Sequence, residues 1–197
     1  MRATFPTAYF GSIDYYQKMV DEKAVNWEIY EHYVKQTIRN RMTIIGPNGI
    51  QALSIPVSKV NGNKTQTKDI QISRAENWEK NHWKAIETAY GASPYFEHYA
   101  QEVHELIYQK TNSLIDFNWN IHARILKWLE LPIETGFTTA YAVEIERDYR
   151  SAFEERNTQR SDSYVQVFLE NGNFAPDLSI LDAIFNLGPM TRKLFID

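Results

Sequence analysis

The chain has 197 residues, of which 43% are hydrophobic and 23% are charged, a composition typical of a globular protein of about one domain. Its net charge of −4 and pI near 5.8 argue against a dedicated nucleic-acid-binding protein, which usually has a pI of about 9 or more. It has no cysteine, which excludes disulfides, thiolate catalysis and Cys-ligated metal sites, and no apolar run long enough for a signal peptide or a membrane span, so we expect a cytoplasmic protein.

The first third of the chain predicts strands that are separated by turns. Its elements are an extended segment at 4–10, a short helix at 13–20, and strands at 24–30, 38–45, 53–57 and 70–72. The strongest turn signal is Gly46-Pro47-Asn48-Gly49, which lies between two segments in which apolar and polar residues alternate. This part of the chain is therefore expected to be rich in sheet.

Three helices in series are predicted over about residues 75–130, because apolar residues recur there at helical spacing. The signals at their starts are Ser73 with Glu76, Ser93-Pro94, and Ser113 with Asp116. Such residues satisfy the amide groups that have no partner in the first turn of a helix. Gly91 ends the first helix and Leu131-Pro132 ends the third.

The last third of the chain alternates between predicted sheet and helix. Its elements are a short strand followed by a charged helix within residues 135–157, a polar loop at 158–163, and a returning strand at 164–168. Ser179, with Asp182 three residues later, caps a final helix that ends at Gly188-Pro189.

Together these elements predict an α/β fold. A central mixed sheet, with a β-rich N-terminal third, is flanked by the run of helices at about 75–130 and by a C-terminal helix. No internal repeat or low-complexity tract divides the chain, so we expect a single domain over residues 1–197.

The most chemically capable motif runs from Glu31 to Arg41, between two predicted strands. His32 is the candidate catalytic acid or base, and the neighbouring Glu31 is the carboxylate that would fix its tautomer. The predicted substrate-binding residues are Tyr33, Lys35, Gln36, Arg39, Asn40, Arg41, Lys68 and Asp69. Arg39 and Arg41 are expected on one strand face, where their planar guanidinium groups suit a carboxylate or phosphate. An anionic ligand follows from this pattern.

A structural interpretation of the two arginines stays open beside the functional one. In that interpretation, Arg39 and Arg41 pair with carboxylates such as Glu31, Asp69 or Glu87 and only stabilise the fold. The chain has more carboxylates than cations, which favours pairing of these arginines within the protein. The two interpretations differ in whether the guanidinium groups have protein partners.

Six further residues are secondary site candidates: Tyr9, His82, Gln166, Asp177, Ser179 and Asp182. His82 lies between Trp78 and Ile86 on an apolar helix face, where a histidine is more often a hydrogen-bonded core residue. Asp177, Ser179 and Asp182 would surround a helix N-terminus that binds an anion, although helix capping explains the same residues without a ligand.

Neither a metal nor a cofactor can be assigned from the sequence. His98 and His104 point in different directions around a helix, so we predict no metal site there. The phosphate-binding P-loop and the Gly-x-Gly-x-x-Gly dinucleotide motif are absent, as is a Gly-x-Ser-x-Gly nucleophile turn. The cofactor is therefore left unknown.

Three blocks of sequence resemble the WbqC-like protein family. They are Pro6-Thr7-Ala8-Tyr9-Phe10 with Tyr15-Tyr16, the Glu31 to Arg41 motif with Leu53 to Val57 and Lys68-Asp69-Ile70, and Tyr164-x-Gln166-x-Phe168 with Phe174 to Asp182. The family takes its name from a gene in a surface-polysaccharide (O-antigen) cluster, so the resemblance implies bacterial sugar metabolism. Longer relatives carry a glycine-rich segment with a nearby tyrosine where this chain has Thr138 to Asp162, which contains no glycine. The chain therefore resembles a short form.

The resemblance and the polar motif give two hypotheses. The leading one is a cytoplasmic, transferase-type enzyme that acts on a small anionic substrate, an activated sugar or nucleotide sugar, in surface-polysaccharide biosynthesis. The rival is a non-catalytic binding or assembly protein for polysaccharide-biosynthesis partners, which the 14% aromatic content and the lack of a complete catalytic motif favour. The two are distinguished by whether Glu31, His32, Arg39 and Arg41 converge in one concave pocket. The oligomeric state is left open.

Overall fold

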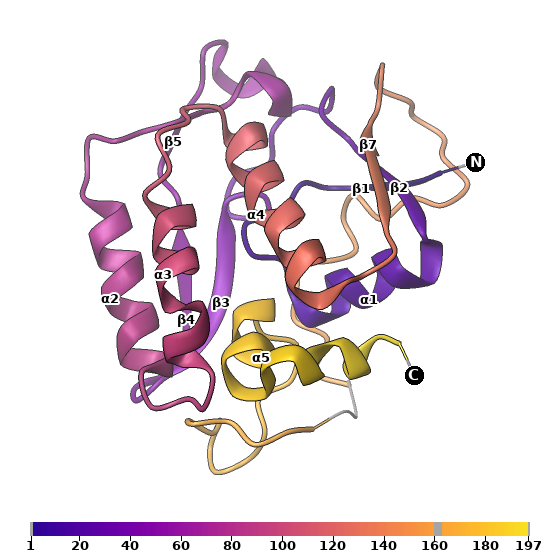
Figure 1. The fold of residues 1–197 in the computed structure, drawn as a ribbon. Helices are drawn as coiled ribbons and strands as arrows, with labels where there is room; N and C mark the ends of the chain where they lie inside the picture. The colour runs from indigo at the N-terminus through magenta and orange to yellow at the C-terminus, as the bar shows by residue number, and fades with distance from the viewer. Residues whose placement is uncertain (1, 160–162, 197) are drawn as a thin grey trace.

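The computed structural model describes residues 2–159 and 163–196, and it has the α/β fold that the sequence predicts (Figure 1). Its parallel sheet has the order β1-β2-β7, with β1 at Ala3–Phe5, β2 at Ala24–Trp27 and β7 at Glu134–Phe137. Helix α1 (Ile13–Glu22) connects β1 to β2 as a crossover, which parallel neighbours require. The described strands outside this sheet form two antiparallel pairs, so parallel and antiparallel pairing lie in separate sheets and not in the one central mixed sheet that the sequence predicts.

The first antiparallel pair is a hairpin of β3 (Arg41–Gly46) and β4 (Gly49–Ser54). Gly49 has a φ of +92°, a conformation that glycine adopts without the steric cost that a side chain would add. The second pair joins two short strands, β5 (Val57–Ser58) and β6 (Gln71–Ile72). Two single turns of 3₁₀-helix lie between them, at Gly62–Lys64 and Thr67–Asp69.

Among the described residues four more α-helices follow, and Figure 1 shows where they lie. They are α2 (Trp78–Tyr90), α3 (Phe96–Ile107), α4 (Leu114–Leu129) and α5 (Ile180–Leu187), the last of which continues into a 3₁₀-helix at Gly188–Leu194. Ser113 caps α4 as predicted, since its Oγ accepts the amide of Asp116 at 3.2 Å. None of these helices is long and apolar enough to cross a bilayer.

The predicted cap at Ser73 is wrong, because α2 begins only at Trp78. The amide of Ser73 donates to the carbonyl of Pro56, and the Arg74 guanidinium donates to the carbonyls of Gln109 and Thr111. These bonds hold the segment against β5 and the α3–α4 connection in a non-helical conformation. Tertiary contacts have therefore overridden the local capping signal.

The predicted helix within residues 138–157 is also wrong, although the strand before it is β7. In place of a helix, the Arg150 guanidinium binds the Asp148 carboxylate and the carbonyl of Ala142. The backbone at 147–149 pairs with Thr4 and extends the parallel sheet beyond β1. The predicted loop at 158–163 lies partly outside the described residues, because 160–162 are not described.

The alternation at 164–168 does not mark a strand. Gln166 binds both the amide and the carbonyl of Ala175 through its side chain, at 2.9 and 3.0 Å. Tyr164 and Gln166 point inward, and Val165 between them is 87% exposed. The side chains thus alternate as in a strand, but the Gln166 side chain makes the hydrogen bonds that the backbone of a neighbouring strand would otherwise make.

Strand boundaries differ from the predictions by a few residues. The predicted strand at 24–30 ends at Trp27, and the one at 38–45 begins only at Arg41. The extended segment at 4–10 is a strand only to Phe5, since the chain turns through Phe10, whose φ is +42°. The predicted strand at 53–57 is divided between β4 and β5.

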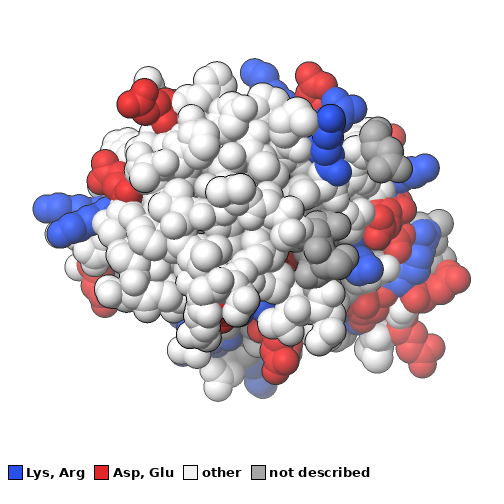
Figure 2. Space-filling model, turned by 90° about the horizontal axis from the view of Figure 1, so that it is seen from below, with Lys and Arg blue, Asp and Glu red and all other residues white. Residues whose placement is uncertain are grey.

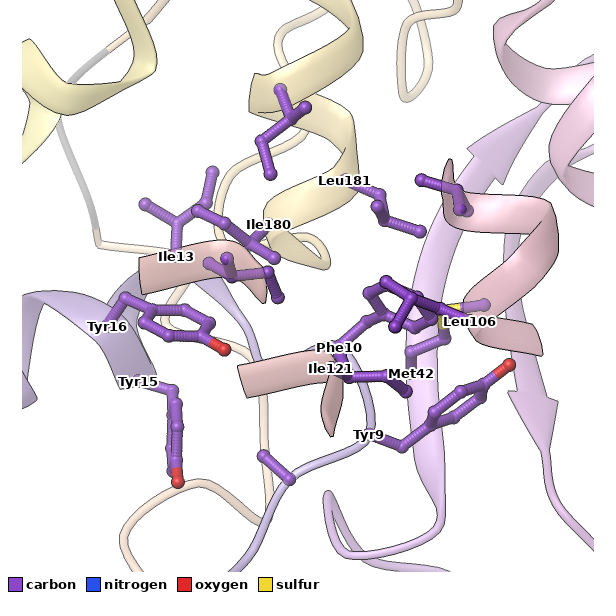
Figure 3. Packing of buried hydrophobic residues seen from close by; sticks show 14 of the residues in the cluster. Tyr9, Phe10, Ile13, Tyr15, Tyr16, Met42, Leu106, Ile121, Ile180 and Leu181 are labelled. Carbon is purple, nitrogen blue, oxygen red and sulfur yellow. The ribbon is translucent and has the colours of Figure 1, made fainter. Parts of the chain in front are cut away.

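The main hydrophobic core lies where the N-terminal segment meets β3 and the helices (Figure 3). In Figure 3, Phe10 and Tyr16 from the N-terminal segment point toward side chains from α4 and α5. Tyr9 points to the other side, past Met42 of β3, and its hydroxyl contacts His82 of α2. All three rings are 1% exposed or less. Much of the aromatic content therefore packs inside the protein, where large rings remove apolar surface from water.

Candidate functional site

A pocket of about 180 Å³ lies on the face of the β3–β4 hairpin that is turned away from the main core. Its walls come from four other parts of the chain: the turn at Phe10 and Ser12, residues 36–38, residues 153–156, and Asp177 with Ser179. Segments that are far apart in the sequence thus meet there, as they do in many ligand sites.

The alternation of β3 explains why the pocket is polar. Met42 and Ile44 point into the main core, so Arg41, Thr43 and Ile45 point to the opposite side of the hairpin. Ile45, near the turn, is covered by a second small cluster that includes Ala175 and Leu178. The Arg41 end of the strand has no such cover, and the pocket lies there.

Arg41 is the cation of this pocket with which no described carboxylate pairs. Its Nε donates to Ser54 Oγ, on the directly opposite residue of β4, at 2.9 Å. Within the part of the chain that the structure describes, no carboxylate lies within 4.0 Å of its guanidinium group. A guanidinium has five N–H donors, so most of the donors of Arg41 are available to a ligand.

The wall at residues 153–156 carries charge of both signs. Arg156 is paired, because it donates to both carboxylate oxygens of Glu170, at 3.0 and 2.9 Å. Glu154 and Glu155 are exposed, and no described residue forms an ion pair with either. Neither residue is among the predicted site residues, because the sequence pattern favours a helix there; the charged run Glu154-Glu155-Arg156 is the signal that points to them.

Asp177 and Ser179 line the pocket but already bind the protein. The Asp177 carboxylate accepts the amide of Asp14 and the amide of Asn157, both at 2.8 Å. Burial raises the pKa of Asp177, and these backbone donors act against that shift. Ser179 Oγ donates to the carbonyl of Phe10 at 2.9 Å. The capping interpretation therefore accounts for both residues, with Asp177 at the N-terminus of α1.

Glu31 and Arg39 form a buried ion pair, and neither residue lines the pocket. Arg39 Nε donates to Glu31 Oε1 at 2.6 Å, and both side chains are less than 10% exposed. The remaining nitrogens of Arg39 donate to Thr37 Oγ1 at 3.2 Å and to the carbonyl of Arg150 at 3.0 Å. Arg39 thus follows the structural interpretation, and it does not share a pocket with Arg41.

His32 is exposed and does not line the pocket. It pairs through its backbone with Gln66, and no described residue contacts its ring by a hydrogen bond. Tyr33 beside it is buried, which raises the pKa of its phenol. Lys35 is exposed, and Gln36, at a φ of +58°, does line the pocket.

The other predicted binding residues have local structural roles. Asn40 Nδ2 donates to the carbonyl of Ile55 at 2.8 Å. Lys68 Nζ lies 4.3 Å from the centre of the Tyr30 ring, a cation–π contact. Asp69 is partly buried at the end of a 3₁₀ turn, and its amide donates to the carbonyl of Gln66. None of the three lines the pocket.

Tyr9 and His82 form a buried pair in the core, as the core interpretation predicts. The Tyr9 hydroxyl lies 2.9 Å from His82 Nδ1. Burial lowers the pKa of His82 to about 4, so its ring is neutral at pH 7.

Gln166 and Asp182 form a second buried pair, at 2.8 Å, in which the amide of Gln166 donates to the carboxylate. Tyr164 donates to the same carboxylate oxygen at 2.5 Å. Burial raises the pKa of Asp182 to about 6, against the effect of these donors.

The pocket therefore collects Gln36, Arg41, Asp177 and Ser179 from the sequence-predicted set, together with the unpredicted Glu154 and Glu155. Glu31, His32, Arg39 and Arg41 do not converge in one pocket. Among residues 2–159 and 163–196, no three His, Asp or Glu side chains gather as a metal site requires.

Comparison with known proteins places this chain in a family. A family model described as the WbqC-like protein family matches residues 7–166. The chain belongs to this family. The WbqC-like match includes Arg41 and the wall at 153–156, and it ends before Asp177.

One relative is an uncharacterized protein, Rv1507c, of Mycobacterium tuberculosis (strain ATCC 25618 / H37Rv). It is 25% identical over 186 residues, which cover 79% of this chain and 80% of that protein. No solved structure matches the chain. This relative is uncharacterized, so it indicates no activity for this chain.

Proposed function

We propose that this WbqC-like protein binds a small anionic metabolite, an activated sugar or nucleotide sugar, in the pocket at Arg41. It acts on that substrate as a cytoplasmic, transferase-type enzyme of bacterial surface-polysaccharide (O-antigen) biosynthesis. The observation that carries the proposal is the unpaired guanidinium group of Arg41 in a polar pocket with walls from five parts of the chain. A planar guanidinium suits the oxygens of a phosphate or carboxylate.

The other unbound polar groups of the pocket suit a hydroxylated ligand. The side chains of Gln36 and Thr43 line the pocket and make no hydrogen bond with the described residues. An amide and a hydroxyl both donate and accept, so they can orient sugar hydroxyl groups. Arg41 then anchors the charged end of the ligand, and these neutral groups position the rest.

Proton transfer has two sets of candidates. Glu154 and Glu155 are carboxylates that line the same pocket as Arg41, so we assign the acid or base role to one of them. The sequence-based candidate is His32 with Glu31. If His32→Ala abolishes turnover and Glu154→Gln with Glu155→Gln does not, the assignment to the pocket carboxylates is wrong.

Thermal stability against a panel of nucleotide sugars, sugar phosphates, acyl thioesters and nucleotides tests the binding step. A ligand at ~100 times its Kd stabilises a protein by about 2.7 kcal/mol, or roughly 5–11 °C for a domain of this size. We expect such a shift with one ligand class, its loss in Arg41→Ala, and its retention in Arg192→Ala. Arg192 is a matched control because it pairs with Glu130 at the surface, outside the pocket.

Absence of a shift with every ligand class would contradict the proposal. It would favour the rival hypothesis, a non-catalytic binding or assembly protein for polysaccharide-biosynthesis partners.

A further inference from the structure

On one face of the molecule, the described residues present few charged side chains (Figure 2). Figure 2 views the protein from below the orientation of Figure 1, and lysine, arginine, aspartate and glutamate of the described residues lie around the edge of this view. The lower end of Figure 1 contains the β3–β4 turn, the connection between α2 and α3, and the loops that precede α5. We call this surface the uncharged face.

The sequence explains the uncharged face. The β3–β4 turn at 46–49 and the segments at 88–96, 163–169 and 171–176 contain no Lys, Arg, Asp or Glu, and Glu170, between the last two segments, is paired with Arg156. Residues 178–191 contain a single charged residue, Asp182, and its side chain is fully buried. Charged residues make up 23% of the chain, so their exclusion from all these segments leaves one surface that differs from the rest.

Apolar and amide side chains occupy the segments that form this face. Val165 is 87% exposed, Leu169 50% and Met190 48%. Asn48 and Asn171 are also exposed. An amide carries both donors and an acceptor, so it can pair with a copy of itself.

We infer that the uncharged face is the surface through which two copies of this chain associate. A symmetric dimer brings one patch against the same patch, so the patch must complement itself. A patch with one sign of charge would be repelled by the same patch on the second copy. Each copy also carries a net charge of −4. An uncharged face of exposed aliphatic and amide groups avoids this repulsion, and the centres of protein interfaces are depleted in charge.

The same charge pattern disfavours two other occupants. Nucleic acids and anionic membranes are bound through lysine and arginine, which this face lacks among the described residues. A dimer interface of about 800 Å² per partner would take less than a tenth of the 9928 Å² accessible surface. A second copy therefore fits the face in charge and requires only a modest part of the surface.

Sedimentation velocity over a wide concentration range tests the inference on the purified chain. We expect a species of twice 23.1 kDa for the wild type and the monomer for Val165→Glu with Leu169→Glu. The matched control is Val60→Glu with Val143→Glu, which makes the same change of charge at two valines that are 62% and 79% exposed and belong to other segments. The control should dimerise as the wild type does.

Two further measurements keep the outcomes distinct. All four substituted side chains are half exposed or more, so thermal midpoints of both variants should match the wild type and exclude misfolding. The dimer should persist at high salt, because an interface without charges is not screened. A wild type that stays monomeric, a face variant that still dimerises, or a dimer that salt dissociates would each overturn the inference.

Discussion

Arg39 and Arg41 are two residues apart in the sequence and have opposite environments. Arg39 is 2% exposed and uses its nitrogens on Glu31, Thr37 and the Arg150 carbonyl. Arg41 opens into a pocket and binds only Ser54 Oγ among the described residues. The difference shows that a guanidinium group becomes available to a ligand only where the fold leaves its donors without protein acceptors.

The position of each arginine relative to β3 produces this difference. Arg39 precedes the strand, in a turn whose backbone is fixed by Asn118, which donates to the Arg39 carbonyl at 2.8 Å. Its side chain is directed to the Glu31 carboxylate and the Arg150 carbonyl. Arg41 is the first residue of the strand and points away from the core by alternation. One arginine therefore stabilises the fold, and the other faces the pocket.

The largest expected effect comes from removing the buried arginine. Arg39→Met leaves the Glu31 carboxylate buried without its cation, and breaking a buried pair in this way costs about 3–5 kcal/mol. Urea unfolding at pH 7 measures the loss. We expect the midpoint to fall while the slope of the transition stays unchanged.

The double variant Glu31→Gln with Arg39→Met is the control for this prediction. This variant has no buried Glu31 carboxylate without a partner, so it should be more stable than Arg39→Met alone. Equal instability of both variants would show that the other bonds of Arg39, rather than the ion pair, account for its effect.

A change of pH tests other buried titratable groups in the same way as the buried Arg39. It should have the next largest effect on the free energy of unfolding. Burial lowers the pKa of His82 to about 4 and that of His122 to about 3. The unfolded state therefore binds more protons than the folded state below pH ~6.5, and stability falls as the pH falls. From pH 7 to pH 5 the two histidines together cost roughly 4 kcal/mol.

The contribution of Asp182 to stability changes with pH in the opposite direction to that of the two histidines. Its pKa is raised to about 6, so its contribution to stability falls as pH rises from ~4 to ~6. Acidification from pH 7 to pH 5 therefore raises the contribution of Asp182 to stability by roughly 1.3 kcal/mol. Asp177, whose pKa is also raised by burial, changes in the same direction, so the net loss is about 2 kcal/mol or less. Urea unfolding at the two pH values measures this difference. Equal stability at pH 5 and pH 7 would contradict the burial of the two histidines.

Local sequence signals predicted the elements whose causes are local. The cap at Ser113 and the alternation in β3 depend on residues within one turn or one strand, and both are present in the structure. The α/β class follows from the order of such elements. The failed elements, at 73–77, 138–157 and 164–168, are held by distant partners such as Gln109, Thr4 and Ala175. No local pattern encodes those contacts.

The candidate site was predictable only in part for the same reason. Arg41 and Gln36 could be selected because they lie in a polar motif, and Asp177 and Ser179 because they have capping spacing. Spacing could not show that Glu31 would take Arg39 as its partner and leave Arg41 unpaired. It also could not bring Glu154 and Glu155 to a strand more than a hundred residues earlier.

Arg41→Ala should have the smallest effect on stability, and this completes the contrast with Arg39. The substitution removes one hydrogen bond, to Ser54 Oγ, at a position where water can reach both partners. Because no buried carboxylate loses a cation, the change in unfolding free energy should stay within about 0.5 kcal/mol. Urea unfolding beside Arg39→Met makes the comparison direct. A loss near that of Arg39→Met would mean that the Arg41 guanidinium has a structural role, and the pocket would then lose its anion anchor.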